Sequence, residues 1–91
     1  MKVRISKSLA KDTAKITDKK VKEKLFKKIE QLQNAENLSQ QPIKKLKGFK
    51  DFYRIRIGDY RLGVKKLTEQ EILLVRFLQR KEIYKYFPKR D

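Results

Sequence analysis

The chain has 91 residues, of which 26 are Lys or Arg and 11 are Asp or Glu, so its formal charge is +15 and its isoelectric point is near 10.2. We expect residues 1–91 to form one small domain with a shallow cleft, and the charge predicts an anionic partner: nucleic acid first, then an acidic protein or an anionic membrane surface. Because the sequence has neither Cys nor His, it excludes disulfides, thiolate or imidazole zinc sites and every catalytic triad built on histidine.

The N-terminal residues 1–6 lack the apolar run of a signal peptide. No segment approaches the roughly 20 apolar residues that a membrane-spanning helix needs. The expected location is therefore the cytoplasm, with no membrane partner.

The N-terminal third of the chain predicts a strand followed by two helices. Residues 2–6 alternate between apolar and basic side chains, as a short strand does. Ser6 or Ser8 is a candidate N-cap for a first helix that runs to about Thr17.

A second helix follows directly. Asp18 is a candidate N-cap, and apolar residues at helical spacing predict a helix to about Asn34. We expect both helices to cover the apolar face of a sheet and their lysines to face solvent. Residues 36–42 are polar and are interpreted as a connection. Residues 44–50 form a basic lead-in to the next element, with a turn at Gly48.

A hairpin over residues 52–64 is the most distinctive predicted element. Its turn lies at residues 58–59, and alternation places apolar side chains on one face and basic ones on the other. Arg54 and Arg56 lie on the basic face, and Arg61 lies beside them if the apolar residues share the core. Guanidinium groups on one face repel each other, so the face predicts a bound polyanion.

The C-terminal part predicts one more strand and a short helix. Residues 70–78 are apolar almost throughout, which favours a central strand covered on both faces. A helix is predicted from about Arg80 to Tyr86, ending before Pro88. Arg80 and Tyr84 share one face of it and can close one side of the basic sheet face. A tyrosine beside guanidinium groups suits RNA, because a base stacks on the ring while arginines hold the phosphates.

The residues alone leave simpler interpretations open. Arginines on the open face of an antiparallel sheet commonly serve solubility. Tyr86 and Phe87 are interpreted as anchors of the last helix on the sheet. The order of elements predicts an α+β fold, in which an N-terminal strand and a two-helix hairpin pack on a small, mostly antiparallel sheet with a short C-terminal helix.

Two segments of the chain resemble the RelE/ParE superfamily of bacterial and archaeal toxins. They are Leu46-Lys-Gly-Phe-Lys-Asp-Phe-Tyr-Arg-Ile-Arg-Ile-Gly-Asp-Tyr-Arg-Leu62 and Val75-Arg-Phe-Leu-Gln-Arg-Lys-Glu-Ile-Tyr84. The likeness covers nearly the whole chain, because the order of elements also matches and is that of a RelE-like fold. It implies a toxin of a type II toxin-antitoxin system, an endoribonuclease that cuts messenger RNA in the ribosomal A site. It also implies an inhibitory RelB-like antitoxin that wraps around the toxin.

The resemblance implies roles for particular residues. Arg61 matches the arginine of the Tyr-Arg step, Arg80 the arginine before the C-terminal helix, and Tyr84 the tyrosine on that helix, which makes these three the expected catalytic residues. The residues expected to bind RNA are Arg54, Arg56, Lys47, Lys50 and Gln79. Gln79 departs from the family pattern, since many relatives have histidine there, and some have lysine at positions 54 and 56. Neither glutamine nor arginine moves a proton at neutral pH, so the sequence assigns no general base.

The expected reaction is attack of a ribose 2′-OH on the adjacent phosphate. In this hypothesis Arg61 and Arg80 stabilise the phosphate charge, and Tyr84 stacks on a base or orients the 2′-OH. Metal-dependent nucleases gather carboxylates, whereas the acidic residues here are scattered along the chain, so no metal or other cofactor is expected. Two alternatives stay open: a ParE-like inhibitor of DNA gyrase, which has no need of the arginines, and a non-catalytic basic RNA-binding module.

Overall fold

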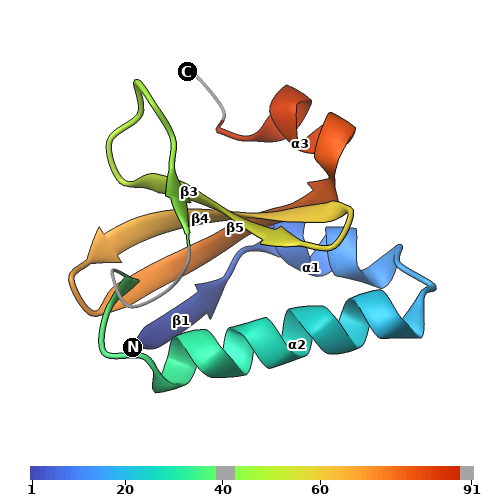
Figure 1. Cartoon of the computed structure of the whole chain (residues 1–91), viewed down its shortest axis with the longest axis horizontal. Helices are drawn as coiled ribbons and strands as arrows, with labels where there is room; N and C mark the ends of the chain where they lie inside the picture. Colours follow the sequence, from blue (N-terminus) through green and yellow to red (C-terminus); the bar gives the residue numbers. More distant parts are fainter. Residues whose placement is uncertain (39–42, 89–91) are drawn as a thin grey trace.

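The structure, a computed structural model, describes residues 1–38 and 43–88. Its elements in chain order are β1 (Lys2–Ile5), α1 (Lys7–Ala14), α2 (Lys19–Asn34), β2 (Lys44–Lys45), β3 (Phe52–Ile57), β4 (Tyr60–Thr68), β5 (Glu71–Gln79) and α3 (Arg80–Tyr86). They form three layers, with α1 and α2 on one face of the sheet and α3 on the other (Figure 1). None of the helices in the described ranges is both long and apolar enough to cross a bilayer.

The five strands form one sheet in the order β1-β5-β4-β3-β2. β1 runs parallel to β5, while the other three neighbouring pairs are antiparallel. The predicted α+β fold with a mostly antiparallel sheet is therefore confirmed. The predicted C-terminal strand lies inside the sheet, between β1 and β4, and is displaced by one residue from the predicted bounds.

The first helix is shorter than predicted, whereas the second begins at its predicted N-cap. Asp18 has an extended backbone (φ −73°, ψ 110°), and its carboxylate accepts hydrogen bonds from the backbone N–H groups of Lys20 and Val21. α1 ends at Ala14, where the N–H of the C-cap Lys15 donates hydrogen bonds to the carbonyl groups of Asp12 and Thr13, so the predicted end at about Thr17 is wrong. The start of α1 and the full length of α2 match the sequence, and Ser6 is the N-cap of α1.

The strand β2 was not predicted. It consists of two residues that pair with Tyr53 and Arg54 of β3, inside the segment interpreted as a basic lead-in. Two residues are too few to show the period of a strand, so their pairing depends on β3 being present. The predicted turn at Gly48 is confirmed by its φ of +82°.

The main core lies between the sheet and the helix pair. Leu25 and Leu32 of α2 are completely buried against the apolar face of the hairpin. That face carries Ile55, Ile57, Leu62 and Val64, which are all buried. The alternation predicted from the sequence is thus confirmed, because these residues leave the opposite face to the arginines.

A smaller core lies between the sheet and α3. Phe87 is 3% exposed and lies directly over Gly63, where a Cβ atom would come within 2.7 Å of the phenyl ring. The ring also makes an edge contact with Phe52, with 5.5 Å between centroids. The predicted anchoring role is confirmed for Phe87, and the more exposed Tyr86 also contacts the sheet, where its ring lies against the Arg76 guanidinium of β5.

Beyond the end of β1, the backbone of β5 forms hydrogen bonds with side chains of α1 and of its N-cap residue. β1 pairs only with the first four residues of β5. Farther along, Ser6 Oγ donates a hydrogen bond of 2.7 Å to the carbonyl of Val75, and the Asp12 carboxylate accepts one of 3.0 Å from the N–H of Phe77. The same buried carboxylate accepts two hydrogen bonds of 2.8 Å from Arg76. These contacts fix the helix pair on the sheet.

Candidate functional site

The basic face of the hairpin is the starting point of the candidate site. The register of β3 and β4 places Arg56 directly opposite Arg61 and Arg54 opposite Gly63. Gly63 has no side chain and is covered by Phe87, while the three arginines line one cleft together with residues of α3. The predicted grouping of Arg54, Arg56 and Arg61 is therefore present.

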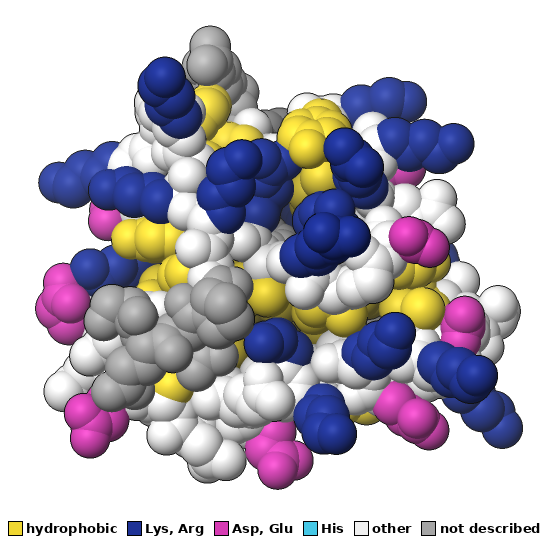
Figure 2. All heavy atoms as spheres, viewed as in Figure 1, with side chains coloured by type: hydrophobic (Ala, Val, Ile, Leu, Met, Phe, Trp, Pro, Cys, Tyr) yellow, Lys and Arg dark blue, Asp and Glu magenta, His cyan; other side chains and the backbone are white. Residues whose placement is uncertain are grey.

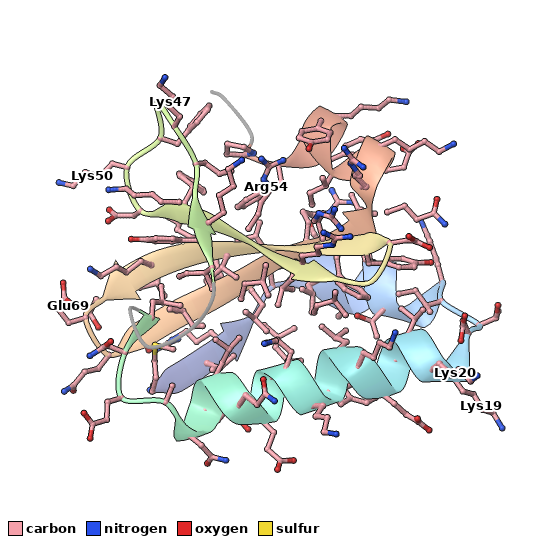
Figure 3. The ribbon with its side chains drawn as sticks, viewed as in Figure 1. Lys19, Lys20, Lys47, Lys50, Arg54 and Glu69 are labelled. Atoms are coloured by element: carbon pink, nitrogen blue, oxygen red, sulfur yellow. The ribbon has the colours of Figure 1, made fainter. Side chains whose placement is uncertain are left out.

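The helix α3 closes one side of this face. The backbone N–H of Arg80 donates a hydrogen bond of 2.9 Å to the carbonyl of Asp59 in the hairpin turn, so α3 begins beside the turn. Arg80 and Tyr84 then follow on successive turns of α3. A cleft of about 610 Å³ results, lined by Ile43, Lys44, Arg54, Arg56, Arg61, Arg80 and Tyr84. Figure 3 shows Arg54 rising from β3 into the space between the β2–β3 loop and α3.

Arg54 and Tyr84 are in direct contact across this cleft. The guanidinium carbon of Arg54 lies 4.7 Å from the centroid of the Tyr84 ring, in a cation–π arrangement. Hydrogen bonding by Arg54, its positive charge and a smaller contribution from Arg80 lower the pKa of the Tyr84 hydroxyl from its ordinary value of 10.0. The tyrosine is 60% exposed, so a ligand in the cleft can reach its side chain.

Arg61 is held by the turn of its own hairpin. Its Nη1 donates hydrogen bonds to the carbonyls of Gly58, at 3.0 Å, and Tyr60, at 2.9 Å. Gly58 has a φ of +59°, which the hairpin turn requires. The contacts fix the guanidinium and leave its Nη2 and Nε groups without a hydrogen-bond partner among the described residues. Such a preorganised cation suits a charge that develops on a ligand.

No acidic side chain among the described residues forms an ion pair with an arginine of the cleft. Within residues 1–38 and 43–88, the carboxylates in ion pairs contact Lys2, Arg4, Lys66, Arg76 or Lys85 and none of the four cleft arginines. The same part of the chain holds no group of three or more acidic side chains that would bind a metal ion. Figure 2 shows Lys and Arg side chains gathered over the β2–β3 loop, β3 and α3. The cleft is therefore built to bind an anion.

Three residues that the sequence placed among the RNA-binding set lie outside this cleft. Gln79 is exposed at the N-terminus of α3 and lines a neighbouring recess, which shares Arg80 and Tyr84 with the cleft. Lys47 lines a second recess on the side of the β2–β3 loop. Lys50 points away from α3 and from Arg54 (Figure 3), and it lines none of the recesses described here.

Sequence reasoning missed Lys44 as a member of the site. Lys44 pairs with Arg54 across β2 and β3, and it therefore stands on the basic face. The basic composition of residues 44–50 pointed to this segment. Without a predicted strand, however, the face of the sheet on which Lys44 lies could not be assigned.

Comparison with known proteins gives one family and several similar structures. Residues 3–84 match the family described as the ParE toxin of the type II toxin-antitoxin system parDE. The chain is 38% identical over 90 residues to Toxin RelE3 of Methanocaldococcus jannaschii, which covers 97% of this chain and 100% of that protein. It is similar to the toxin in the RelB-RelE antitoxin-toxin complex from Methanococcus jannaschii, with a TM-score of 0.77, 35% identity and coverage of 93% of this chain and 99% of that one.

A more distant structure shares the fold alone. The chain of the intact RelBE toxin-antitoxin complex of E. coli superposes with a TM-score of 0.68 at 21% identity, over 86% of this chain and 94% of that one. The fold is thus retained where four residues in five differ.

Proposed function

Because this chain belongs to the ParE toxin family of type II toxin-antitoxin systems, as a RelE-like toxin of the RelE/ParE superfamily, we propose that it is a ribosome-dependent endoribonuclease that cuts messenger RNA in the A site. The observation that supports this activity is the single cleft that gathers Arg54, Arg56, Arg61, Arg80 and Tyr84. A toxin that acts only by occupying another protein needs no such group of unpaired cations around a tyrosine.

The proposed reaction is a transfer within the RNA chain. The 2′-oxygen of one ribose attacks the adjacent phosphorus, the bond to the 5′-oxygen of the next nucleotide breaks, and a 2′,3′-cyclic phosphate and a free 5′-OH are formed. The 2′-OH loses a proton and the leaving oxygen gains one, so no oxidant, reductant or metal enters the balance. The chain's task is to hold the nucleotides in line and to stabilise the growing negative charge.

The positions of the arginines indicate two different roles in this reaction. Arg61, held by two backbone carbonyls, and Arg80, at the start of α3, stabilise the charge on the phosphate oxygens. Arg54 and Arg56 bind the RNA backbone on either side, as fixed guanidinium forks suit phosphate. One preorganised donor of this kind is worth about 3 to 4 kcal/mol of activation free energy.

Tyr84 is the group proposed to act on the 2′-OH. Among the described residues that line the cleft it is the one phenol, and Arg54 and Arg80 lower its pKa. Its hydroxyl orients the 2′-OH and, when ionised, accepts the proton. Gln79 takes no part in proton transfer, because an amide cannot titrate near neutral pH.

The proposed regulator is a RelB-like antitoxin. The similar toxin from Methanococcus jannaschii was solved in complex with RelB. A formal charge of +15 favours a partner with acidic segments, so complex formation should weaken as salt is added.

The name of the matched family favours a second candidate function, inhibition of DNA gyrase in the manner of a ParE toxin. Primer extension on a message that is being translated separates the two. Discrete cuts within codons, produced by the wild-type protein and lost with Arg80→Ala, are expected for the nuclease. DNA damage that depends on gyrase, with an uncut message and an active Arg80→Ala variant, would replace the nuclease by the gyrase inhibitor.

A further inference from the structure

A second recess adjoins the arginine cleft on the side of the β2–β3 loop. It has a volume of about 770 Å³ and lies between the loop and the end of α3. Its floor is apolar and is lined by Leu46, Phe49, Phe87 and Pro88, of which Leu46 and Phe87 are buried and Phe49 and Pro88 are half-buried. Its rim carries lysines 44, 45, 47 and 85, and no acidic side chain of the described residues lines it. The volume and the apolar floor suit a flat ring system.

The floor is a fixed aromatic surface. Phe49 lies edge-on to Phe52, with 6.1 Å between centroids, and Phe52 lies edge-on to Phe87, at 5.5 Å. Phe87 is in turn held on Gly63. Rings that are fixed in this way lose little conformational entropy when another ring stacks on them.

The recess and the arginine cleft form one continuous surface. They share three lining residues, Lys44, Arg54 and Tyr84. An extended strand whose phosphate lies among the arginines therefore places its next nucleotide over the recess. Arg54 covers one face of the Tyr84 ring, so a base next to the arginine cleft can also lie over the half-buried ring of Phe49 in the recess.

We propose that this recess is a nucleobase subsite, which receives the base of the nucleotide next to the cleaved phosphodiester in single-stranded RNA. The proposal rests on the proposed nuclease function and adds the residues that hold the substrate beside the scissile bond. The apolar floor stacks on the base, and the lysine rim, Lys47 and Lys85 above all, binds the flanking phosphates. An acidic peptide with an apolar side chain also fits a basic rim, but the shared Arg54 and Tyr84 make RNA the better match.

The test uses the full chain and a short single-stranded RNA whose 2′-OH is methylated at the cleavage site, so that it binds without being cut. A fluorescent purine analogue is placed on the 5′ side or the 3′ side of the protected phosphate. Binding to the wild-type protein should quench the analogue at one of these positions. Phe49→Ala should remove the quenching and weaken binding about 10-fold, which is the loss expected for one stacked base.

Two matched controls test whether the effect of Phe49→Ala comes from loss of stacking on the base. Phe26→Ala removes an exposed phenylalanine on α2, outside the recess, and should change neither quenching nor affinity. An RNA that lacks the base at the quenched position should bind the wild-type and Phe49→Ala proteins equally well, because the ring then has nothing to stack on. Circular dichroism of Phe49→Ala should match the wild type.

The outcomes separate this proposal from the proposed function. If Arg80→Ala weakens RNA binding or cleavage while Phe49→Ala does not, the nuclease function stands and the subsite is wrong. If Phe49→Ala weakens only the complex with a RelB-like antitoxin, the recess is a protein-binding surface and the subsite is again wrong. If the RNA does not bind at all and translated messages are not cut, both proposals fail.

Discussion

The guanidinium of Arg54, on β3, and the ring of Tyr84, on α3, lie in cation–π contact at 4.7 Å. The contact joins the two elements that form opposite walls of the candidate active site. Hydrogen bonding and positive charge from Arg54 also make the largest contributions to the lowered pKa of the Tyr84 hydroxyl. The proton chemistry proposed for Tyr84 therefore depends on a residue of another element.

Removing Arg54 should raise the pKa of Tyr84. The folded-state pKa lies below 10.0 because positive charge and hydrogen bonding favour the phenolate, so the phenolate forms at lower pH in the wild type than in Arg54→Ala. The measurement is a titration of tyrosinate absorbance, with the Tyr84→Phe protein subtracted to remove the other three tyrosines. Arg56→Ala, a change on the same strand, should leave the pKa of Tyr84 unchanged.

The same change should alter the pH dependence of RNA cleavage. If ionised Tyr84 accepts the 2′-OH proton, the rate rises with pH through the Tyr84 pKa, and in Arg54→Ala this rise moves to higher pH. An unchanged profile in Tyr84→Phe would exclude Tyr84 as the proton acceptor.

Asp12 should be the acidic residue most important for stability. Its buried carboxylate accepts two hydrogen bonds from Arg76 and one from the backbone of β5. Asp12→Ala leaves these donors unpaired, and since the Arg76 side chain retains 23% exposure we expect a loss of about 2 to 3 kcal/mol in the free energy of unfolding. Urea denaturation measures it. Glu69→Ala, which removes an exposed carboxylate paired with Lys66, should cost much less.

Gly63 should tolerate no side chain while Phe87 is present. A methyl group there would lie 2.7 Å from the Phe87 ring, so Gly63→Ala should lower the free energy of unfolding by about 1 to 3 kcal/mol. In a Phe87→Ala background the added methyl has room, and its cost should fall by about 1 kcal/mol or more. A double-mutant cycle measures this coupling. Additive effects would show that the glycine is required for another reason.

Sequence reasoning succeeded where the pattern is local. The period-two alternation around Arg54 and Arg56 gave the basic face, and Pro88 with the apolar strand before it gave the bounds of α3. Asp18 gave the start of α2 through the preference of its side chain for an N-cap.

The features that were missed depend on contacts between distant residues. Asp12 and Arg76 are joined only once α1 is docked on β5, and neither residue carries a local sign of its partner. β2 forms by pairing with β3, so the position of Lys44 in the cleft could not be predicted from the local sequence. Lys50 was included for its charge, but the turn before β3 directs it away from the site.

We propose that Arg61 stabilises the phosphate during cleavage. The most direct measurement is the single-turnover rate at which the protein cuts a message bound in the A site, compared between Arg61→Ala and Lys20→Ala. The second change removes an equal charge at the start of α2, far from Arg54 (Figure 3). We predict that Arg61→Ala cuts about 100 to 1,000 times more slowly than the wild type while folding normally, and that Lys20→Ala cuts at the wild-type rate. Equal rates for the two variants would show that Arg61 does not stabilise the phosphate during cleavage.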